Sequence, residues 1–213
     1  MRPHSAAVSA VLALLAAGCA DVELRPIEPE EQPVFRQALD PLLRAAYGDD
    51  AAKCRVGVGV EEATRYDTWI TRVGEGPCDL DVMLTTATLR DLMPRALQTL
   101  LAHDLGHFES RHATGQARVI ELLSAKSATG HQSVLRTGNE QFTPEEEAAA
   151  DLAAARLLTR VWGGSNVGCM ATADFYEDIA KNRQRWGAWL SRHPHPERRV
   201  DAIVKACEAA GGR

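Results

Sequence analysis

The stretch Leu101-Ala102-His103-Asp104-Leu105-Gly106-His107 determines how the rest of this sequence is interpreted. Two histidines four residues apart on a helix project from the same face, one turn from each other. Their imidazoles can then bind one Zn²⁺ at about 2.0–2.1 Å each. The spacing alone is weak evidence, because the chain has 7 histidines and about 0.2 such pairs arise by chance. The carboxylate that directly follows the first histidine strengthens the interpretation as a metal site.

A helix is expected around this stretch. Pro94 suits a first helical turn, where its missing N–H costs nothing. Leucines and a phenylalanine recur at helical spacing after it and form one apolar face. A third metal ligand must then come from elsewhere in the chain, because two histidines do not complete a zinc site.

The third ligand is sought in the next predicted helix. Thr143-Pro144-Glu145-Glu146 is typical of a helix start, with a threonine cap, a proline at the first position and a glutamate completing a capping box. Glu147 and Asp151 follow, four residues apart on one face. We choose Glu147 as the ligand, and Asp151 as the acceptor of a hydrogen bond from a ligating imidazole. The alternative is an acidic first turn that only stabilises the helix dipole.

Three motifs in order resemble those of one family. Residues 101–108 with Arg111-His112-Ala113 resemble the L-A-H-E-L-G-H…R-H-A signature of the HtpX-like zinc metallopeptidases, gluzincins that include the CAAX prenyl proteases. Glu147 and Asp151 match that family's E-x-x-A-D element. His193-Pro194-His195-Pro196-Glu197-Arg198-Arg199-Val200 matches its H-P-x-P-E-x-R-I element. The resemblance covers roughly residues 80–207.

The resemblance implies a fold and an activity. The fold class is α+β, a zincin-like metallopeptidase domain with a small antiparallel sheet and several helices. The expected cofactor is one Zn²⁺ held by His103, His107 and Glu147. The expected function is that of a zinc metalloendopeptidase of the bacterial cell envelope, acting on unfolded or damaged proteins, so that the partner is a protein or peptide substrate.

Asp104 departs from the family pattern, which has Glu at this position. The family's carboxylate moves a proton between water and the leaving amine. Asp carries out the same chemistry but is shorter by about 1.5 Å, and a misplacement near 1 Å costs about 10²-fold in rate. Asp104 is therefore the candidate catalytic residue, with an alternative: a zinc-binding, catalytically weak or inactive module that acts as an envelope assembly or chaperone factor.

His193 is the second candidate catalytic residue. Near a metal, it could donate a hydrogen bond to the oxyanion of a tetrahedral intermediate. It could also occupy the open zinc position and keep the site latent. The remaining alternative is a histidine that only shapes a proline-rich turn.

The first 18 residues are typical of a bacterial lipoprotein signal peptide. Arg2 is positive, residues 6–17 are apolar, and the run is too short to span a bilayer. It ends in Gly18-Cys19, which predicts lipidation of Cys19, although a plain secretory signal cut near Ala20 is the alternative. Because Ala20 is not Asp, the expected location is the periplasmic face of the outer membrane, with the lipid as the only membrane contact. Residues 19–34 are predicted as a tether and 35–213 as the domain.

The remaining four cysteines are an even number in an oxidising compartment. They allow three pairings, and we prefer Cys54 with Cys78 and Cys169 with Cys207, because each pair brackets one local segment. Free buried thiols are the alternative.

Composition and patterning complete the prediction. The formal net charge is −5, with no long basic stretch, which argues against a nucleic-acid partner. Residues 55–60, 68–73 and 80–84 are predicted strands, with a turn at 74–77. Residues 35–47, with a kink or restart at Pro41, 171–189 and 197–209 are predicted helices, and 130–142 is a predicted loop.

Overall fold

The computed structural model describes residues 21–72, 76, 78–109, 132–135, 142–164 and 166–211. The predicted signal peptide, Cys19 and the Arg111-His112-Ala113 motif lie outside the described residues. The elements, in chain order, are β1 (Asp21–Pro26), α1 (Gln32–Tyr47), η1 (Gly48–Lys53), β2 (Val56–Glu61), β3 (Thr68–Arg72), β4 (Leu80–Thr85), α2 (Thr86–Asp91), α3 (Pro94–Glu109), β5 (Gln132–Leu135), α5 (Pro144–Trp162), α6 (Val167–Lys181), α7 (Gly187–Leu190) and α8 (Pro196–Gly211).

The sheet has five strands in the order β3-β4-β2-β1-β5. The β3–β4 pair is antiparallel, as predicted, with Ile70 opposite Val82. Strand β2 pairs with β4 in parallel, with Val58 opposite Val82, so the sheet is mixed and not wholly antiparallel as predicted. The reason is that β3 takes the outer edge beside β4, which leaves the inner edge of β4 for β2.

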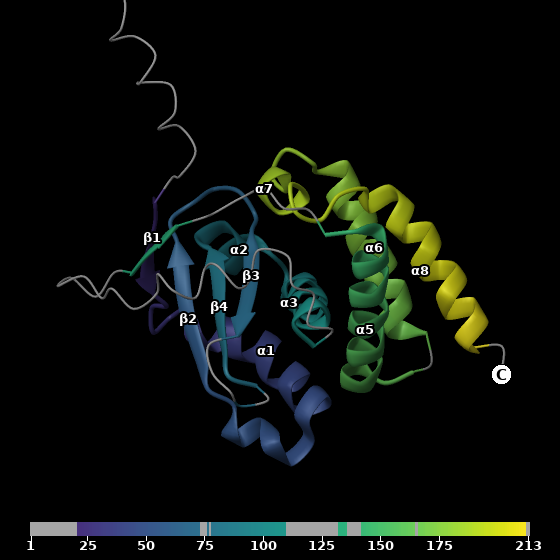
Figure 1. Cartoon of the computed structure of the whole chain (residues 1–213), viewed down its shortest axis with the longest axis horizontal. Helices are drawn as coiled ribbons and strands as arrows, with labels where there is room; N and C mark the ends of the chain where they lie inside the picture. Colours follow the sequence, from purple (N-terminus) through teal and green to yellow (C-terminus); the bar gives the residue numbers. More distant parts are fainter. Residues whose placement is uncertain are drawn as a thin grey trace, which may run out of the picture.

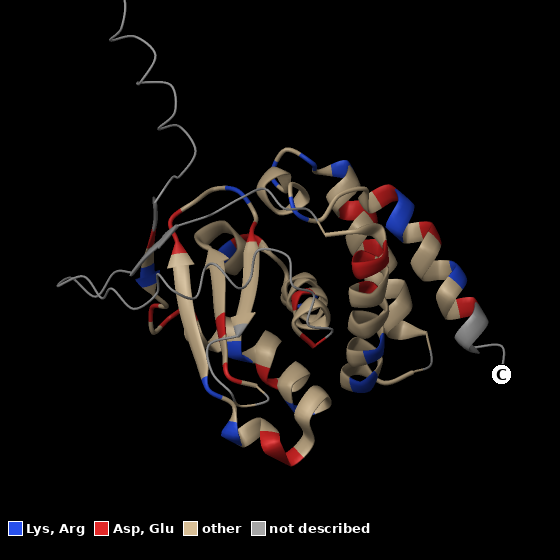
Figure 2. Cartoon of the chain, in the orientation of Figure 1, with Lys and Arg blue, Asp and Glu red and all other residues tan. Residues whose placement is uncertain are grey.

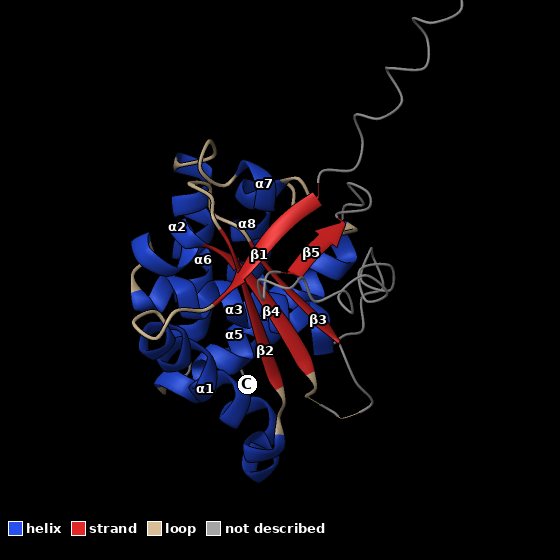
Figure 3. Ribbon diagram, turned by 90° about the vertical axis from the view of Figure 1, so that its left-hand side faces the viewer, coloured by secondary structure: helices blue, strands red, loops and turns tan. Residues whose placement is uncertain are grey.

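The helices lie in layers on one side of the sheet. Figure 1 shows α3 between the sheet and a helical group formed by α5, α6 and α8, with α1 packed beside α3. Figure 3 views the opposite face of the sheet, with the helices behind it. Helix α3 is therefore buried on both sides, and 12 of its residues have buried side chains. A polar group on α3 that faces α5 consequently lies deep inside the protein.

Two apolar clusters hold these layers together. The first joins the sheet to α1, α3 and α5. The second joins α3 to α6, α8 and the segment around α7, and contains Phe175, Tyr176, Trp186 and Trp189. Helix α3 contributes residues to both clusters.

Both disulfides of the preferred pairing are present. Cys54 and Cys78 join the segment before β2 to the segment before β4. Cys169 and Cys207 join α6 to α8. Each half of the fold therefore has one covalent cross-link.

Four local predictions differ from the structure. Residues 21–26 form strand β1 between β2 and β5, although residues 19–34 were expected to be a tether. Helix α1 continues through Pro41 without a break. The predicted loop at 130–142 contains β5, and the helix predicted over 171–189 divides into α6 and α7, with Asn182 capping the first.

Two further observations concern the exterior. None of the described helices is both long and apolar enough to cross a bilayer. Figure 2 shows positive and negative residues interspersed over the sheet side and the helical side, with acidic residues gathered at the first turn of α5.

Candidate metal centre

His103 and His107 project from successive turns of α3 toward one point. Both side chains are buried. Their Nε2 atoms lie 3.0 Å apart, and their rings are nearly perpendicular, at 87°. The helical spacing seen in the sequence therefore places two imidazole nitrogens at the same position.

Gly106, between these histidines, allows α5 to approach α3. A Cβ atom built on Gly106 would lie 2.5 Å from the carbonyl oxygen of Ala150 and 2.9 Å from its Cα. Real side chains do not tolerate such contacts. Because Gly106 has no side chain, α5 can pack close enough to α3 for its carboxylates to reach the histidines.

The first turn of α5 points Glu147 inward. Thr143 and Glu146 form the predicted capping box, each accepting a hydrogen bond from the other's backbone N–H. Glu145 is exposed, whereas Glu147 is buried at 2% exposure. The Oε2 atom of Glu147 lies 3.5 Å from the Nε2 atom of His103 and 3.8 Å from that of His107. Glu147 is thus the one carboxylate of this turn that reaches both histidines.

Asp151, one turn further along α5, lies behind His103. Its Oδ1 atom is 2.9 Å from the Nδ1 atom of His103, on the side of the ring opposite the Nε2 atom. A carboxylate there fixes the ring orientation and keeps the proton on Nδ1, so that Nε2 is free to bind a metal. This is the position that the sequence analysis predicted for Asp151.

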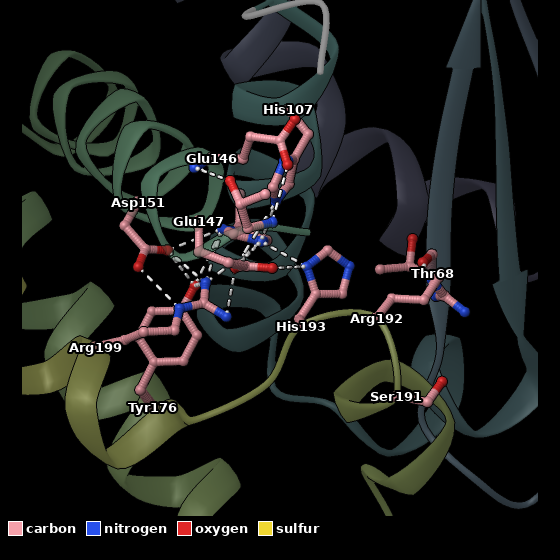
Figure 4. Close-up of polar contacts among 12 residues, drawn as sticks. Thr68, His107, Glu146, Glu147, Asp151, Tyr176, Ser191, Arg192, His193 and Arg199 are labelled. Atoms are coloured by element: carbon pink, nitrogen blue, oxygen red, sulfur yellow. Dashed lines mark hydrogen bonds and ion pairs between the residues drawn. The ribbon is translucent and has the colours of Figure 1, made fainter. Parts of the chain in front are cut away.

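His193 completes the cluster from the segment before α8. Its Nδ1 atom lies 3.1 Å from the Nε2 atom of His103 and 2.9 Å from the Oε1 atom of Glu147. Its ring stacks on Trp189, with centroids 4.3 Å apart. Figure 4 shows His193 reaching toward the group formed by His107 and Glu147. One ligand-type atom from each of these four residues lies within 4.8 Å of the others.

The separations fit a small tetrahedral ion. Two ligand atoms of a tetrahedral zinc lie about 3.3 Å apart, given bonds of about 2.0–2.1 Å. The distances from the Nε2 atom of His103 to its three neighbours in the cluster are 3.0, 3.1 and 3.5 Å. A single ring nitrogen cannot make hydrogen bonds to all of them at once. Two or three imidazoles and one carboxylate are, in addition, a donor set that zinc prefers.

Burial keeps the imidazoles in the form that a metal requires. Burial, helped by the charge of Arg199, lowers the pKa of His103 to about 3. Burial also lowers the pKa of His193, with the neighbouring His107 adding to the effect. Metal-binding histidines are neutral, so no proton has to be removed from either ring at neutral pH. The residues present therefore fit a zinc ion.

Asp104, the predicted catalytic carboxylate, is buried but outside the four-residue cluster. It lies on α3 toward β3, and its Oδ2 atom has no hydrogen-bond partner among the described residues. Burial raises the pKa of Asp104 well above its usual range, against the opposing effect of Arg192. Figure 4 shows Arg192 and Thr68 on the far side of His193 from α5.

Arg199 and Tyr176 were not predicted as part of the site. The Nε atom of Arg199 donates to the Oδ2 atom of Asp151 at 2.9 Å, and its Nη2 atom to Oδ1 at 2.5 Å. The hydroxyl of Tyr176 donates to the same carboxylate at 2.5 Å. Arg199 belongs to the H-P-x-P-E-x-R-I match quoted from the sequence, and that match was the available signal. Nothing in the sequence pointed to Tyr176.

The carboxylates and Arg199 share one electrostatic environment. Burial alone would raise the pKa of Asp151, but the charge and hydrogen bonds of Arg199 hold it below its usual range. The Nη1 atom of Arg199 also lies 2.7 Å from the Oε2 atom of Glu147. This ion pair supplies a positive charge to the same oxygen that faces both histidines.

Comparison with known proteins agrees with this geometry. The family model described as Peptidase family M48 matches residues 73–206 of the chain. The match includes α3, α5, most of α8 and every residue of the cluster. No curated protein matches the sequence.

Proposed function

Because the chain belongs to peptidase family M48, we propose that it is a zinc-dependent endopeptidase whose single Zn²⁺ is held by His103, His107 and Glu147. The observation that carries this proposal is the convergence of these buried groups within 4.8 Å, together with His193. The substrates that we propose are unfolded or damaged proteins or peptides.

Each side chain then has a chemical task. When bound, zinc polarises the carbonyl of the bond to be cut. Asp151 holds the ring of His103 in place through its Nδ1 atom. Asp104 is the carboxylate next to the site that can accept a proton from water and transfer it to the leaving amine.

His193 can act in two ways, and its position favours one of them. Its Nδ1 atom is within 3.1 Å of His103 and 2.9 Å of Glu147, among the ligand atoms themselves. A donor to an oxyanion would be expected beside the cluster, where the substrate carbonyl binds. We therefore propose that His193 occupies the fourth zinc position in the resting protein and must move before substrate binds.

A second candidate function is supported by Asp104. Its side chain is one methylene group shorter than the glutamate of the family pattern. A protein with these features would bind zinc and peptides but cut them slowly, and would act in the envelope as an assembly or chaperone factor. Both candidates need the same metal ligands, so metal content does not separate them.

The test is a paired assay on the full domain. Zinc content is measured for the wild type, Asp104→Glu and Asp104→Ala, and casein cleavage is followed for each. The endopeptidase proposal expects about one equivalent of zinc in all three and cleavage by the wild type that Asp104→Ala reduces by about 10²–10⁴-fold. No cleavage by the wild type, with cleavage restored in Asp104→Glu, supports the second candidate. Absence of zinc from all three contradicts both.

The location is a separate proposal. We propose that residues 1–18 are removed on export and that Cys19 carries a lipid that places the domain at the periplasmic face of the outer membrane. The pairing of all four cysteines of the domain supports an oxidising compartment. Labelling with a radioactive fatty acid should mark the wild type and not Cys19→Ala. Equal labelling of the two, or no labelling of either, would contradict the lipid anchor.

A further inference from the structure

Arg199 is a buried cation placed against two buried anions. Its side chain is 7% exposed. The guanidinium binds Asp151 with two nitrogens and reaches Glu147 with the third, so a single side chain spans both carboxylates of α5. It also lies over the ring of Tyr176, with its central carbon 4.0 Å from the ring centroid. Figure 4 shows the arginine extending from α8 between these groups.

The guanidinium also approaches the point where the ligand atoms converge. Its Nη2 atom lies 3.4 Å from the Nε2 atom of His103, and its Nη1 atom lies 2.7 Å from the Oε2 atom of Glu147. These are the two atoms that a bound metal would contact. Arg199 therefore provides positive charge beside the metal position without depending on a metal.

The formal charges of the centre show why the positive charge of Arg199 is needed there. Glu147 and Asp151 are one helical turn apart and 2% and 1% exposed, so their negative charges repel each other where water does not screen them. With Arg199 the metal-free centre has a formal charge of −1, and without it the charge would be −2. With Zn²⁺ bound, the same centre is +1 with the arginine and neutral without it.

We propose that Arg199 is the internal counter-cation of the metal centre, which allows the protein to fold before it binds zinc. This inference rests on the proposed function, because it concerns the same zinc site. Arg199 acts through Glu147 and Asp151, so it is a positioning residue. Its loss should destabilise the metal-free protein strongly and the zinc-bound protein much less, since zinc neutralises the same carboxylates.

The experiment measures the melting temperature of the wild type and of Arg199→Met, each stripped with a chelator and each reloaded with Zn²⁺. The zinc-induced rise should be larger in Arg199→Met than in the wild type by on the order of 10 °C. The double variant Arg199→Met/Asp151→Asn removes one negative charge as well, so its metal-free melting temperature should return toward that of the wild type.

Arg25→Met is the matched control. Arg25 is a partly buried arginine that binds both oxygens of Glu31 at 2.8 Å, on the sheet side of the protein. Its removal should lower the metal-free and zinc-bound melting temperatures by the same amount. The zinc-induced rise of this control should therefore equal that of the wild type.

The outcomes are distinct. Recovery of folded Arg199→Met only when zinc is present during refolding supports the proposal. An equal zinc-induced rise in Arg199→Met and the wild type overturns it, as does failure of Arg199→Met to fold with zinc when Arg25→Met folds. If zinc does not raise the melting temperature of the wild type, the proposed zinc site itself is wrong. In that case, a higher melting temperature of Arg199→Met/Asp151→Asn than of Arg199→Met would show that Arg199 and Asp151 form a structural ion pair unrelated to zinc.

Discussion

The Nδ1 atom of His193 lies 3.1 Å from the Nε2 atom of His103, although 90 residues separate them in the chain. This separation is close to that of two ligands on one tetrahedral ion, about 3.3 Å. The stacking of His193 on Trp189 fixes its ring in that direction. A histidine that only shaped the turn before α8 would not need to point inward.

Replacing His193 should change metal binding. In His193→Ala we expect the zinc dissociation constant to rise at least about tenfold, because even residues that only support ligands change metal affinity by about 10–100-fold. The visible absorption spectrum of the Co²⁺-loaded protein should also change, since the set of ligands changes. Competition with a chromogenic chelator measures the affinity.

The neighbouring histidine provides the control for this change. His195 is exposed and has a backbone φ of 60°. His195→Asn keeps a residue that tolerates this backbone conformation, and should leave both the affinity and the Co²⁺ spectrum unchanged. An unaltered spectrum in His193→Ala as well would show that His193 is not a ligand in the resting protein.

Gly106→Ala should destabilise the protein by about 1–3 kcal/mol, as expected for a contact that overfills a packed interior. The added methyl group would meet the backbone of Ala150 at 2.5 Å and push α5 away from α3. Because α5 carries Glu147, zinc affinity should fall as well. Urea unfolding and chelator competition measure the two effects.

Gly187→Ala is the matched substitution for Gly106→Ala. A Cβ atom on Gly187 would meet nothing within 4 Å. We expect its free energy of unfolding to remain within about 0.5 kcal/mol of the wild type, as for other unconstrained surface sites. Similar losses in both variants would mean that the cost at Gly106 does not come from the α3–α5 contact.

Stability at low pH should depend on Glu31. Hydrogen bonds from Arg25 at 2.8 Å hold the pKa of Glu31 at about 2, below its ordinary value of 4.5. A carboxylate with a lowered folded-state pKa stabilises the fold above its unfolded pKa, here by at most about 3 kcal/mol. This contribution is lost as the pH falls from about 4.5 to about 2.

Urea unfolding of Glu31→Gln across this pH range is the measurement. The variant should be less stable than the wild type at pH 7, and the difference should shrink as the pH falls through the same window. Glu30→Gln, at the exposed neighbouring position, should follow the wild type throughout. A difference in Glu31→Gln that does not depend on pH would contradict the ion-pair explanation.

The Cys169–Cys207 disulfide should be a major source of stability. It closes a loop with a sequence separation of 38 residues, for which chain entropy predicts about 4 kcal/mol. The double variant Cys169→Ser/Cys207→Ser should therefore unfold at lower urea. Zinc affinity should fall too, because Cys207 lies on α8, and the segment that leads directly into α8 carries His193.

The Cys54–Cys78 disulfide tests whether the loss of zinc affinity is a local effect of the Cys169–Cys207 disulfide. Cys54→Ser/Cys78→Ser opens a loop with a sequence separation of 24 residues, with a predicted loss of about 3.5 kcal/mol. This cross-link is on the sheet side, so zinc affinity should change little. Equal loss of affinity in both double variants would show that it follows global stability.

Local signals predicted the elements that carry the site. The capping box at Thr143 and Glu146 located the start of α5, and Pro94 located the start of α3. Such signals act over a few residues, so they can be read from the sequence. The cysteine pairs were predictable for the same reason, because each brackets a local segment.

Features that depend on distant partners were missed. Strand β1 follows residue 20 in a proline-bearing, acidic segment and forms only because β2 and β5 pair with it. The parallel pairing of β2 with β4 is fixed by where β3 lies. Arg199 acquires its role from a contact with Asp151, 48 residues earlier in the chain, and no spacing rule connects two helices that are not neighbours in sequence.

Strand β1 also bears on where the protein can work. Only Ala20 lies between Cys19 and the first residue of this strand, and one extended residue spans at most about 3.6 Å. A lipid on Cys19 would therefore hold the sheet close to the lipid headgroups. A long flexible tether, in contrast, would let the domain move away from the membrane. The anchored domain would reach no further from the membrane than about its own diameter. Substrates would therefore have to come to the bilayer surface.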